Sequence, residues 1–248
     1  MIYLYIFLTI LAVSLLSLLG VFALWLKKAV LAKILLFLVA FSAGALIGDS
    51  FLHLLPEIVA KKGLGITVSF PVFAGMLSFF ILEKVLRWHH CHNEKCEEHS
   101  HEHLGIINLV GDGFHNVIDG LLIGASFFVS IPVGIATTIA VALHEIPQEL
   151  GDFGVLVHSG FTRKKALFFN ILSGLMALLG GGLAIFLADR VDGFVQFMMP
   201  YTVGGFLYIA LADLVPELHR DTHLKRTILH IFGFVAGIAI MWLLLFFG

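Results

Sequence analysis

The stretch HEIPQELGDF, residues 144–153, places one histidine, three acidic residues, a glutamine and a proline within ten positions of an otherwise apolar segment. The residues before it read GIATTIAVAL (134–143), and those after it read GVLV (154–157). Ionisable groups at membrane depth are costly unless they face a protein interior or a water-filled path. If this segment crosses a membrane, its polarity therefore predicts a functional site within the span.

The composition of the whole chain supports a membrane location. Of its 248 residues, 59% are hydrophobic and 13% charged, and the mean hydropathy is +1.01. A soluble domain carries about a quarter charged residues. The formal net charge of −2 gives no indication of a nucleic-acid partner. Cys91 and Cys96 lie in one polar segment and do not suggest a disulfide scaffold. The N-terminus lacks the basic region of a cleaved signal peptide.

Eight segments are long and apolar enough to cross a bilayer, for which a helix needs about 20 residues. The connections between them are short, except for the histidine-rich segment HHCHNEKCEEHSHEH (89–103). We therefore predict an all-α membrane protein with a single transmembrane domain over 1–248 and spans at 4–26, 34–56, 66–87, 104–129, 133–157, 164–188, 194–217 and 226–247.

Lysine and arginine are distributed unequally between the predicted loops. Twelve lie in or beside the loops that follow the first, third, fifth and seventh spans, whereas Lys61, Lys62 and Arg190 lie in the others. Basic residues mark cytoplasmic loops. We therefore expect an integral protein of the lipid bilayer, in a plasma membrane, with both termini outside the cytoplasm.

A weak internal repeat connects the second and seventh spans. The second span ends with HLLPE (53–57) and the seventh with DLVPE (213–217), and the two spans run in opposite directions. Equivalent segments of opposite orientation are typical of inverted repeats in secondary transporters. The spans would then be arranged as 3+2+3, with the fourth and fifth between the two halves.

Two polar stripes are expected to face each other on the fourth and fifth spans. At about 100° per residue, the polar side chains of each span occupy less than half of the helix circumference. Imidazole nitrogen, carboxylate oxygen and amide oxygen together suit Zn²⁺, with Fe²⁺, Mn²⁺ or Cd²⁺ as alternatives. The competing interpretation is a structural network of histidines and protonated carboxylates. The stripes comprise Asp112, His115, Asn116 and Asp119 in one span and His144, Glu145, Gln148, Glu149 and Asp152 in the other.

Pro147 and four glycines mark these same two spans. Proline has no N–H, so the carbonyl of Leu143 loses its helical partner, which is tolerated at membrane depth where the backbone lines a cavity. The glycines allow helices to pack closely or to slide, and packing is the simpler explanation for each one. They are Gly120, Gly124, Gly151 and Gly154.

Further polar residues lie on other spans and could extend a transport path. Asp49 and His53 are one turn apart on the second span, and Asp213 occupies the matching place on the seventh. Asn170 on the sixth span could supply an oxygen ligand. For each of these residues, a structural hydrogen bond is an equally good explanation.

The segment 89–103 is dense in metal-binding side chains, although their spacing matches no closed zinc finger. We interpret it as a flexible cytoplasmic loop for metal capture or sensing, with a plain solvated linker as the alternative. Its histidines are His89, His90, His92, His99, His101 and His103.

Taken together, HNVIDG (115–120) and HEIPQELGDF resemble the ZIP family of metal-ion transporters. FLHLLPE (51–57), FLYIALADLVPE (206–217), the eight spans and the histidine-rich loop extend the resemblance over nearly the whole chain. The HEIP motif is similar to that of the histidine-rich subfamily of eukaryotic ZIPs and its prokaryotic relatives.

The resemblance implies uptake of Zn²⁺ or a similar ion into the cytoplasm by a homodimer with an elevator-like motion. It also implies two metal sites between the fourth and fifth spans. The first would be lined by His115, Asp119, His144 and Gln148, and the second by Asn116, Asp119, Glu145, Gln148 and Asn170.

Position 148 departs from the family pattern, which has histidine in this subfamily and glutamate in other ZIPs. An uncharged amide is a weaker ligand, so Gln148 bears on selectivity and on a bridged two-metal site. Two other functions stay open: a metal exporter or non-transporting sensor, and an intramembrane metalloprotease, because HEIPQ is one residue from the H-E-x-x-H motif.

Overall fold

The computed structural model describes residues 1–19, 28–88, 100–219, 221 and 223–247, and these residues form helices joined by short turns, without a strand. The α-helices are α1 (Ile2–Ser14), α3 (Lys28–Asp49), α4 (Leu55–Lys62), α5 (Ile66–Trp88), α6 (Ser100–Phe127), α7 (Ile131–His158), α8 (Arg163–Gly174), α9 (Met176–Ala188), α10 (Phe194–Tyr208), α11 (Val215–His219) and α12 (Leu224–Leu244). Short 3₁₀ or π segments are η1 (Leu15–Leu19), η2 (Ser50–Leu54), η3 (Ile209–Leu214) and η4 (Leu245–Phe247).

Seven helical stretches of the described chain are long and apolar enough to span a membrane. The predicted all-helical membrane class is therefore confirmed. The predicted fifth span, 133–157, corresponds to α7, whose 28 residues would also cross a bilayer. It is not among the seven stretches because its polar side chains lower its hydropathy. The seven are Ile2–Leu19, Ile34–Lys62, Ile66–Lys84, Gly105–Phe127, Arg163–Ala188, Phe194–His219 and Arg226–Leu244.

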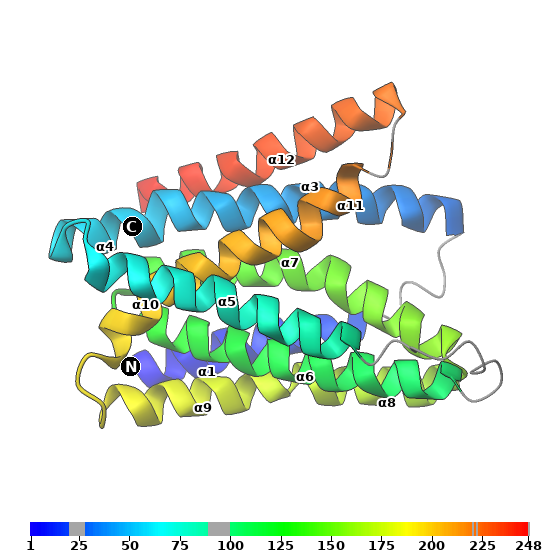
Figure 1. The fold of residues 1–248 in the computed structure, drawn as a ribbon, viewed down its shortest axis with the longest axis horizontal. Coiled ribbons are helices and arrows are strands. Elements are labelled where there is room, and N and C mark those ends of the chain that lie inside the picture. Colours follow the sequence, from blue (N-terminus) through cyan, green and yellow to red (C-terminus); the bar gives the residue numbers. More distant parts are fainter. Residues whose placement is uncertain (20–27, 89–99, 220, 222, 248) are drawn as a thin grey trace.

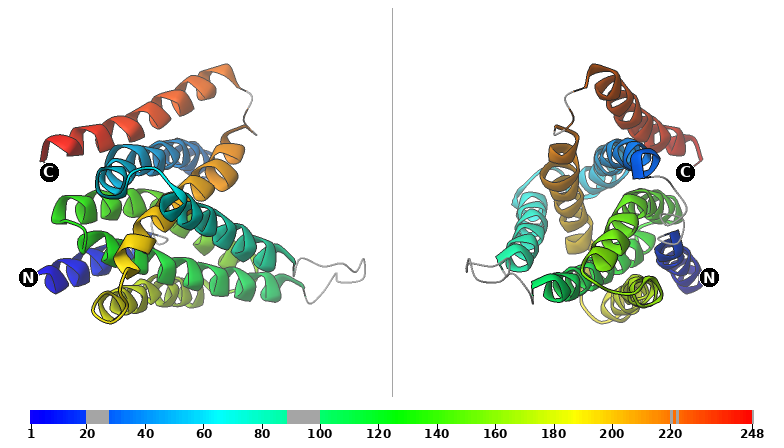
Figure 2. Two further views of the ribbon diagram at one scale, coloured as in Figure 1. Left: turned by 60° about the vertical axis from the view of Figure 1, so that its left-hand side comes forward. Right: turned by 90° about the vertical axis from the view of Figure 1, so that its right-hand side faces the viewer.

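The helices form a bundle in which α7 lies between α3 on one side and α6 on the other (Figures 1 and 2). Both chain termini lie at the same end of this bundle (Figure 1). The carboxyl end of α5 and the amino end of α6 lie at the opposite end. We call these the terminal end and the loop end of the bundle.

Glycines allow close contact in two helix pairs, α3 with α12 and α5 with α10 (Figure 2). In each pair, a Cβ atom added at either of two glycines would lie 2.0–2.2 Å from a carbonyl oxygen of the facing helix. Only glycine permits such close contact between helices. The contacts pair Gly44 with Phe234, Gly237 with Phe41, Gly204 with Val72, and Gly75 with Tyr201.

The two segments of the suspected repeat have the same local structure. The π-helical segment η2 directly precedes the turn that contains Pro56, and η3 directly precedes the turn that contains Pro216. Proline cannot donate the usual helical hydrogen bond, and a π segment is one way in which a helix accommodates such a break.

Most of the histidine-rich segment lies outside the described residues, and that part contains His89, His90, His92 and His99. The predicted boundary at residue 103 is wrong, because α6 already begins at Ser100. The residues SHEH (100–103) include no proline that would prevent a helix. The side chains of His101 and His103 are likewise outside the described part of the chain.

Candidate metal site

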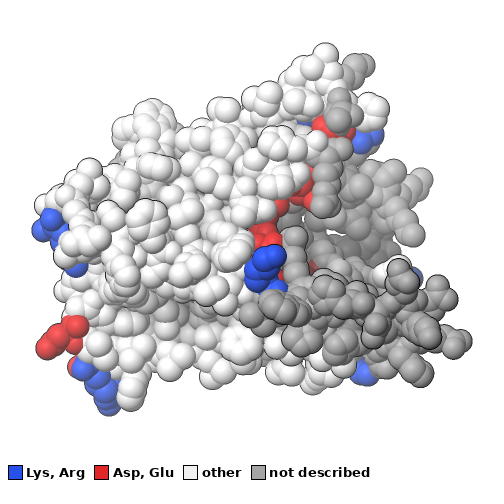
Figure 3. Space-filling model, viewed as in Figure 1, with Lys and Arg blue, Asp and Glu red and all other residues white. Residues whose placement is uncertain are grey.

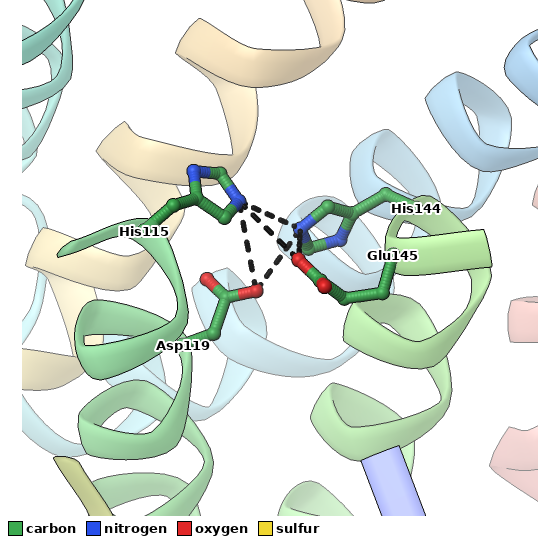
Figure 4. Close-up of side chains that lie close together, drawn as sticks. All are labelled: His115, Asp119, His144 and Glu145. Atoms are coloured by element: carbon green, nitrogen blue, oxygen red, sulfur yellow. Dashed lines mark hydrogen bonds and ion pairs between the residues drawn. The ribbon is translucent and has the colours of Figure 1, made fainter. Parts of the chain in front are cut away.

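Four side chains from α6 and α7 converge at one point inside the bundle (Figure 4). His115 and Asp119 are one turn apart on α6, so they extend from the same face of that helix. His144 and Glu145 are adjacent on α7. We call these four residues the four-residue cluster.

The distances within the four-residue cluster suit a tetrahedral metal ion. His144 Nε2 lies 3.1 Å from Asp119 Oδ2, 3.2 Å from His115 Nε2 and 3.7 Å from Glu145 Oε1. His115 Nε2 lies 3.7 Å from Asp119 Oδ2 and 3.6 Å from Glu145 Oε1. Because zinc bonds to nitrogen and oxygen are about 2.0–2.2 Å long, tetrahedral ligands are about 3.3–3.6 Å apart.

The cluster is buried, and three of its carboxylate oxygens have no hydrogen bond of standard geometry. Asp119, His144 and Glu145 are each at most 1% exposed. Among the described residues, no donor makes a hydrogen bond of standard geometry to either carboxylate oxygen of Asp119 or to Oε1 of Glu145, and the imidazole of His144 lies 3.1 Å from Asp119 Oδ2. Buried polar atoms are normally hydrogen-bonded, so a cation that binds these oxygens would satisfy them.

His144 is oriented as a metal ligand. Its Nδ1 lies 3.2 Å from the carbonyl oxygen of Ala140. Because a carbonyl oxygen can only accept, this contact favours the tautomer with the proton on Nδ1 and a lone pair on Nε2. Such a hydrogen bond on the outer nitrogen is common for metal-binding histidines and fixes the ring orientation.

Pro147 leaves the carbonyl of Leu143 without its helical hydrogen bond, and a side chain of another helix donates to it instead. Ser42 Oγ of α3 lies 2.5 Å from the oxygen of Leu143, and 2.7 Å from the oxygen of Leu38. The helix α7 continues through Pro147. The predicted loss of the helical bond at Leu143 is therefore compensated by a contact between α3 and α7.

Asn116 and Gln148 contact Asp112 one turn from the four-residue cluster. The carboxylate of Asp112 accepts a hydrogen bond from Asn116 Nδ2 at 3.1 Å and from Gln148 Nε2 at 3.2 Å. The hydroxyl of Ser173 donates to its other oxygen. Gln148 therefore adjoins the cluster as a hydrogen-bond donor to a carboxylate.

Glu149 and Asn170 form a separate buried contact, on the side of α7 that faces α8 and η1. Asn170 Nδ2 donates to Glu149 Oε2 at 2.5 Å, and Ser17 Oγ donates to Glu149 Oε1 at 2.7 Å. The five polar side chains of 144–152 therefore do not all extend in one direction, because Glu149 contacts η1 and α8 whereas His144, Glu145 and Gln148 contact side chains of α6.

Asp49 and His53 form a third buried group between the second span and α7. His53 Nδ1 lies 3.3 Å from Asp49 Oδ1, and Thr137 Oγ1 donates to Asp49 Oδ2 at 3.2 Å. Thr137 precedes His144 by about two turns, on the side of the terminal end. This group thus lies on the opposite side of the four-residue cluster from Asp112.

A cavity of about 700 Å³ extends from the four-residue cluster toward the loop end. His115 and Gln148 lie at its inner end, and His158 and Ser159 line it where α7 ends. Figure 3 shows a hollow in one face of the molecule, with acidic side chains at its edge. Asn108, Asp112, Asp152, Glu83 and Asp213 also line the cavity.

The four glycines that the sequence marks on α6 and α7 divide into two groups. A Cβ atom at Gly120 would lie 1.9 Å from the oxygen of Ala177, and one at Gly124 would lie 2.5 Å from the Cβ of Ala184. These two glycines allow α6 to pack closely on α9. At Gly151 and Gly154, which line the cavity, an added Cβ would meet nothing within 4 Å, so the packing interpretation is wrong for these two.

Several polar residues around the site were not predicted from the sequence. Single serines and threonines are common in membrane helices, where their hydroxyls bond to the preceding turn, so nothing in the pattern marks them. Asn108 could have been found, since it lies one turn before Asp112 on the predicted polar face. The unpredicted residues are Ser17, Ser42, Asn108, Thr137 and Ser173.

The fold and the site define an integral membrane protein with a buried group of metal-ligand type and a polar cavity on one side of it. Comparison with known proteins gives the family. The profile of the ZIP zinc transporter family matches residues 2–106 and 88–245. The chain belongs to the ZIP zinc transporter family.

Named relatives agree with this assignment. Zinc transporter ZIP13 of Pongo abelii is 36% identical over 222 residues, covering 82% of this chain and 65% of the relative. Zinc transporter zipt-7.2 of Caenorhabditis elegans is 32% identical, covering 84% and 57%. Zinc transporter YKE4 of Saccharomyces cerevisiae is 31% identical, covering 84% and 70%. The chain thus spans 57% to 70% of the length of these relatives. All three are named zinc transporters, so the family argues against the metalloprotease alternative.

Proposed function

We propose that this protein transports a divalent metal ion, with Zn²⁺ as the principal substrate, and that the ion binds between α6 and α7. The observation that carries the proposal is the convergence of two imidazole nitrogens and two buried carboxylate oxygens at tetrahedral spacing. Both oxygens of Asp119 and Oε1 of Glu145 lack a hydrogen bond of standard geometry, which supports a cation over a structural network. The relatives are named zinc transporters.

We propose uptake as the direction of transport, with the loop end in the cytoplasm. The distribution of charge supports this orientation, because the loops predicted to be cytoplasmic carry most of the lysines and arginines. Export is the second candidate, because this distribution does not depend on the direction of net flow.

We propose eight spans, with α7 as the fifth and with α8 and α9 together as the sixth, arranged as a 3+2+3 inverted repeat. Gly44 stands nine residues before His53, and Gly204 stands nine residues before Asp213. Each of these glycines contacts a carbonyl of the last span of the opposite half. The two π segments before Pro56 and Pro216 support the same pairing.

The metal preference and the assembly state are also proposals. Two imidazoles favour zinc, whereas a larger share of oxygen ligands would favour Mn²⁺ or Fe²⁺. Competition of each ion, and of Cd²⁺, against radioactive zinc uptake would rank them.

The homodimer implied by the family resemblance can be tested by mass photometry of the protein in nanodiscs. Labelling of tags at the termini of intact cells would test the plasma-membrane location and the orientation.

Uptake of zinc into sealed proteoliposomes of known orientation tests the transport proposal. We expect zinc-dependent accumulation above that of protein-free vesicles, and accumulation should saturate with zinc concentration. Binding of zinc without any flux, in either orientation, would instead support a non-transporting sensor.

A further inference from the structure

Two polar pairs continue from the four-residue cluster toward the loop end. Gln148 Nε2 of α7 donates to Asp112 Oδ1 of α6 at 3.2 Å. One turn further, Asn108 Nδ2 of α6 donates to Asp152 Oδ1 of α7 at 3.0 Å. Each pair joins one amide to one carboxylate across the two helices, and all four residues line the cavity.

The carboxylate of Asp112 is held by uncharged donors. The amides of Asn116 and Gln148 and the hydroxyl of Ser173 donate hydrogen bonds to it. Such donors orient a carboxylate without neutralising its charge. Asp112 is 6% exposed, and a buried carboxylate in this setting attracts a cation.

Asp152 brings a second carboxylate close to the first. It lies within hydrogen-bonding reach of Asp112. Two carboxylates at this separation in a poorly solvated site repel each other unless a proton or a cation lies between them. The pair therefore provides a place where a divalent ion would be favoured on its way out of the four-residue cluster.

We propose that Asp112 is the first ligand that accepts the metal ion when it leaves the four-residue cluster, and that Gln148 is a positioning residue that holds Asp112 at the inner end of the cavity. This inference rests on the proposed transport function. Asp152 is the next ligand on the route. The ion thereby passes from a site with two imidazoles to oxygen ligands alone.

Because the ligands change along the route, the affinity for zinc should decrease from the four-residue cluster toward the loop end. Zinc binds tightly where imidazole and carboxylate ligands complete its coordination. Beyond the cluster, each pair supplies one carboxylate and one amide, and the open cavity admits water as further ligands. An ion that exchanges its ligands one at a time avoids complete dehydration at any point.

The test is zinc uptake by proteoliposomes containing the full chain, with equilibrium binding of zinc measured on the same purified variants. Asp112→Asn removes the charge and nearly preserves the shape. We expect the maximal uptake rate to fall about tenfold, as for the loss of one charge contact. The KM for external zinc and the equilibrium affinity should stay within about twofold, because the four-residue cluster is unchanged. Asp192→Asn, at an exposed position near the terminal end, is the control.

The positioning role of Gln148 predicts non-additivity. Gln148→Leu should lower the maximal rate in the parent protein and have little further effect in the Asp112→Asn background, because its partner is already altered. Independent, multiplicative losses would contradict the positioning role.

Three results separate the inference from the function on which it rests. A parent protein that binds zinc and accumulates none would refute the proposed transport. If the parent accumulates zinc and Asp112→Asn has an unchanged maximal rate, the inference alone fails. It also fails if Asp112→Asn weakens equilibrium binding as much as it lowers the rate, since Asp112 would then belong to the tight site.

Discussion

The two faces of α6 contact their neighbours in opposite ways. The face toward α9 carries Gly120 and Gly124, and packs there backbone against backbone. The face toward α7 carries His115 and Asp119, which meet α7 through polar atoms that converge on one point. One helix thus combines a close backbone contact, which only small residues permit, with a polar contact between buried histidines and carboxylates.

This difference indicates which positions serve stability and which serve function. On the α9 face there is no space for a side chain, so a substitution should disturb the fold. On the α7 face, truncation of a side chain removes a buried ionisable group and disturbs no close backbone contact. Substitutions on the α9 face should therefore lower stability, whereas substitutions on the α7 face should lower zinc uptake.

The largest effect is expected for ligands of the four-residue cluster. Asp119→Ala and His144→Ala each remove one of four converging ligand atoms. Loss of residues that only support metal ligands costs about 10–100-fold, so we expect zinc uptake to fall more than about 100-fold. The protein should stay folded, as judged by size-exclusion chromatography. Near-normal uptake by either variant, at matched membrane levels, would contradict the site.

The opposite result is expected on the glycine face. At Gly120, a Cβ atom would lie 1.9 Å from the oxygen of Ala177, so Gly120→Val must push α6 away from α9. Overpacking typically costs about 1–3 kcal/mol, and we expect the upper part of this range because the clash is with backbone. We expect a large loss of monodisperse protein and a lower Tm.

The matched controls are Gly151→Ala and Gly154→Ala, where an added Cβ meets nothing within 4 Å. Both should retain the parent Tm. If they destabilise the protein as much as Gly120→Val does, the division of the glycines into two groups is wrong.

A smaller effect on stability is expected at the contact between α3 and α7. Ser42→Ala leaves the carbonyl of Leu143 without its donor, and an unsatisfied buried acceptor costs about 1–3 kcal/mol. The Tm should fall by several degrees. Ser69→Ala is the control, because Ser69 is exposed and its Oγ donates to the oxygen of Gly65, directly before the same helix. Equal Tm values for the two variants would show that α7 does not need this contact.

The smallest effect is a change of metal preference at position 148. Gln148→His should favour zinc and Gln148→Glu should favour harder cations such as Mn²⁺, because imidazole and carboxylate differ in their preferred metals. We expect the zinc-to-manganese uptake ratio to shift by about tenfold or less. An unchanged ratio in both variants would show that position 148 does not contact the transported ion.

The sequence predicted the membrane class and most of the helix positions, because an apolar segment of about 20 residues has the length of a membrane-spanning helix. It also predicted that His115, Asp119, His144 and Glu145 share facing stripes, since helical periodicity fixes which side chains lie together. These are the residues that the structure brings together.

Periodicity alone could not separate Glu149 from its neighbours. Its direction depends on which helix packs on that side of α7, and η1 and α8 supply Ser17 and Asn170 there. The contact of Ser42 with Leu143 likewise joins residues about a hundred positions apart. Such contacts follow from tertiary packing and leave no trace in the local pattern.

The central claim is that the four-residue cluster binds the transported ion. The most direct test is a crystal structure of the zinc-loaded full chain with anomalous diffraction data collected on both sides of the zinc absorption edge. We predict an anomalous peak about 2.0–2.2 Å from His115 Nε2, His144 Nε2 and oxygens of Asp119 and Glu145. A zinc-loaded protein with no peak among these four side chains would contradict the claim.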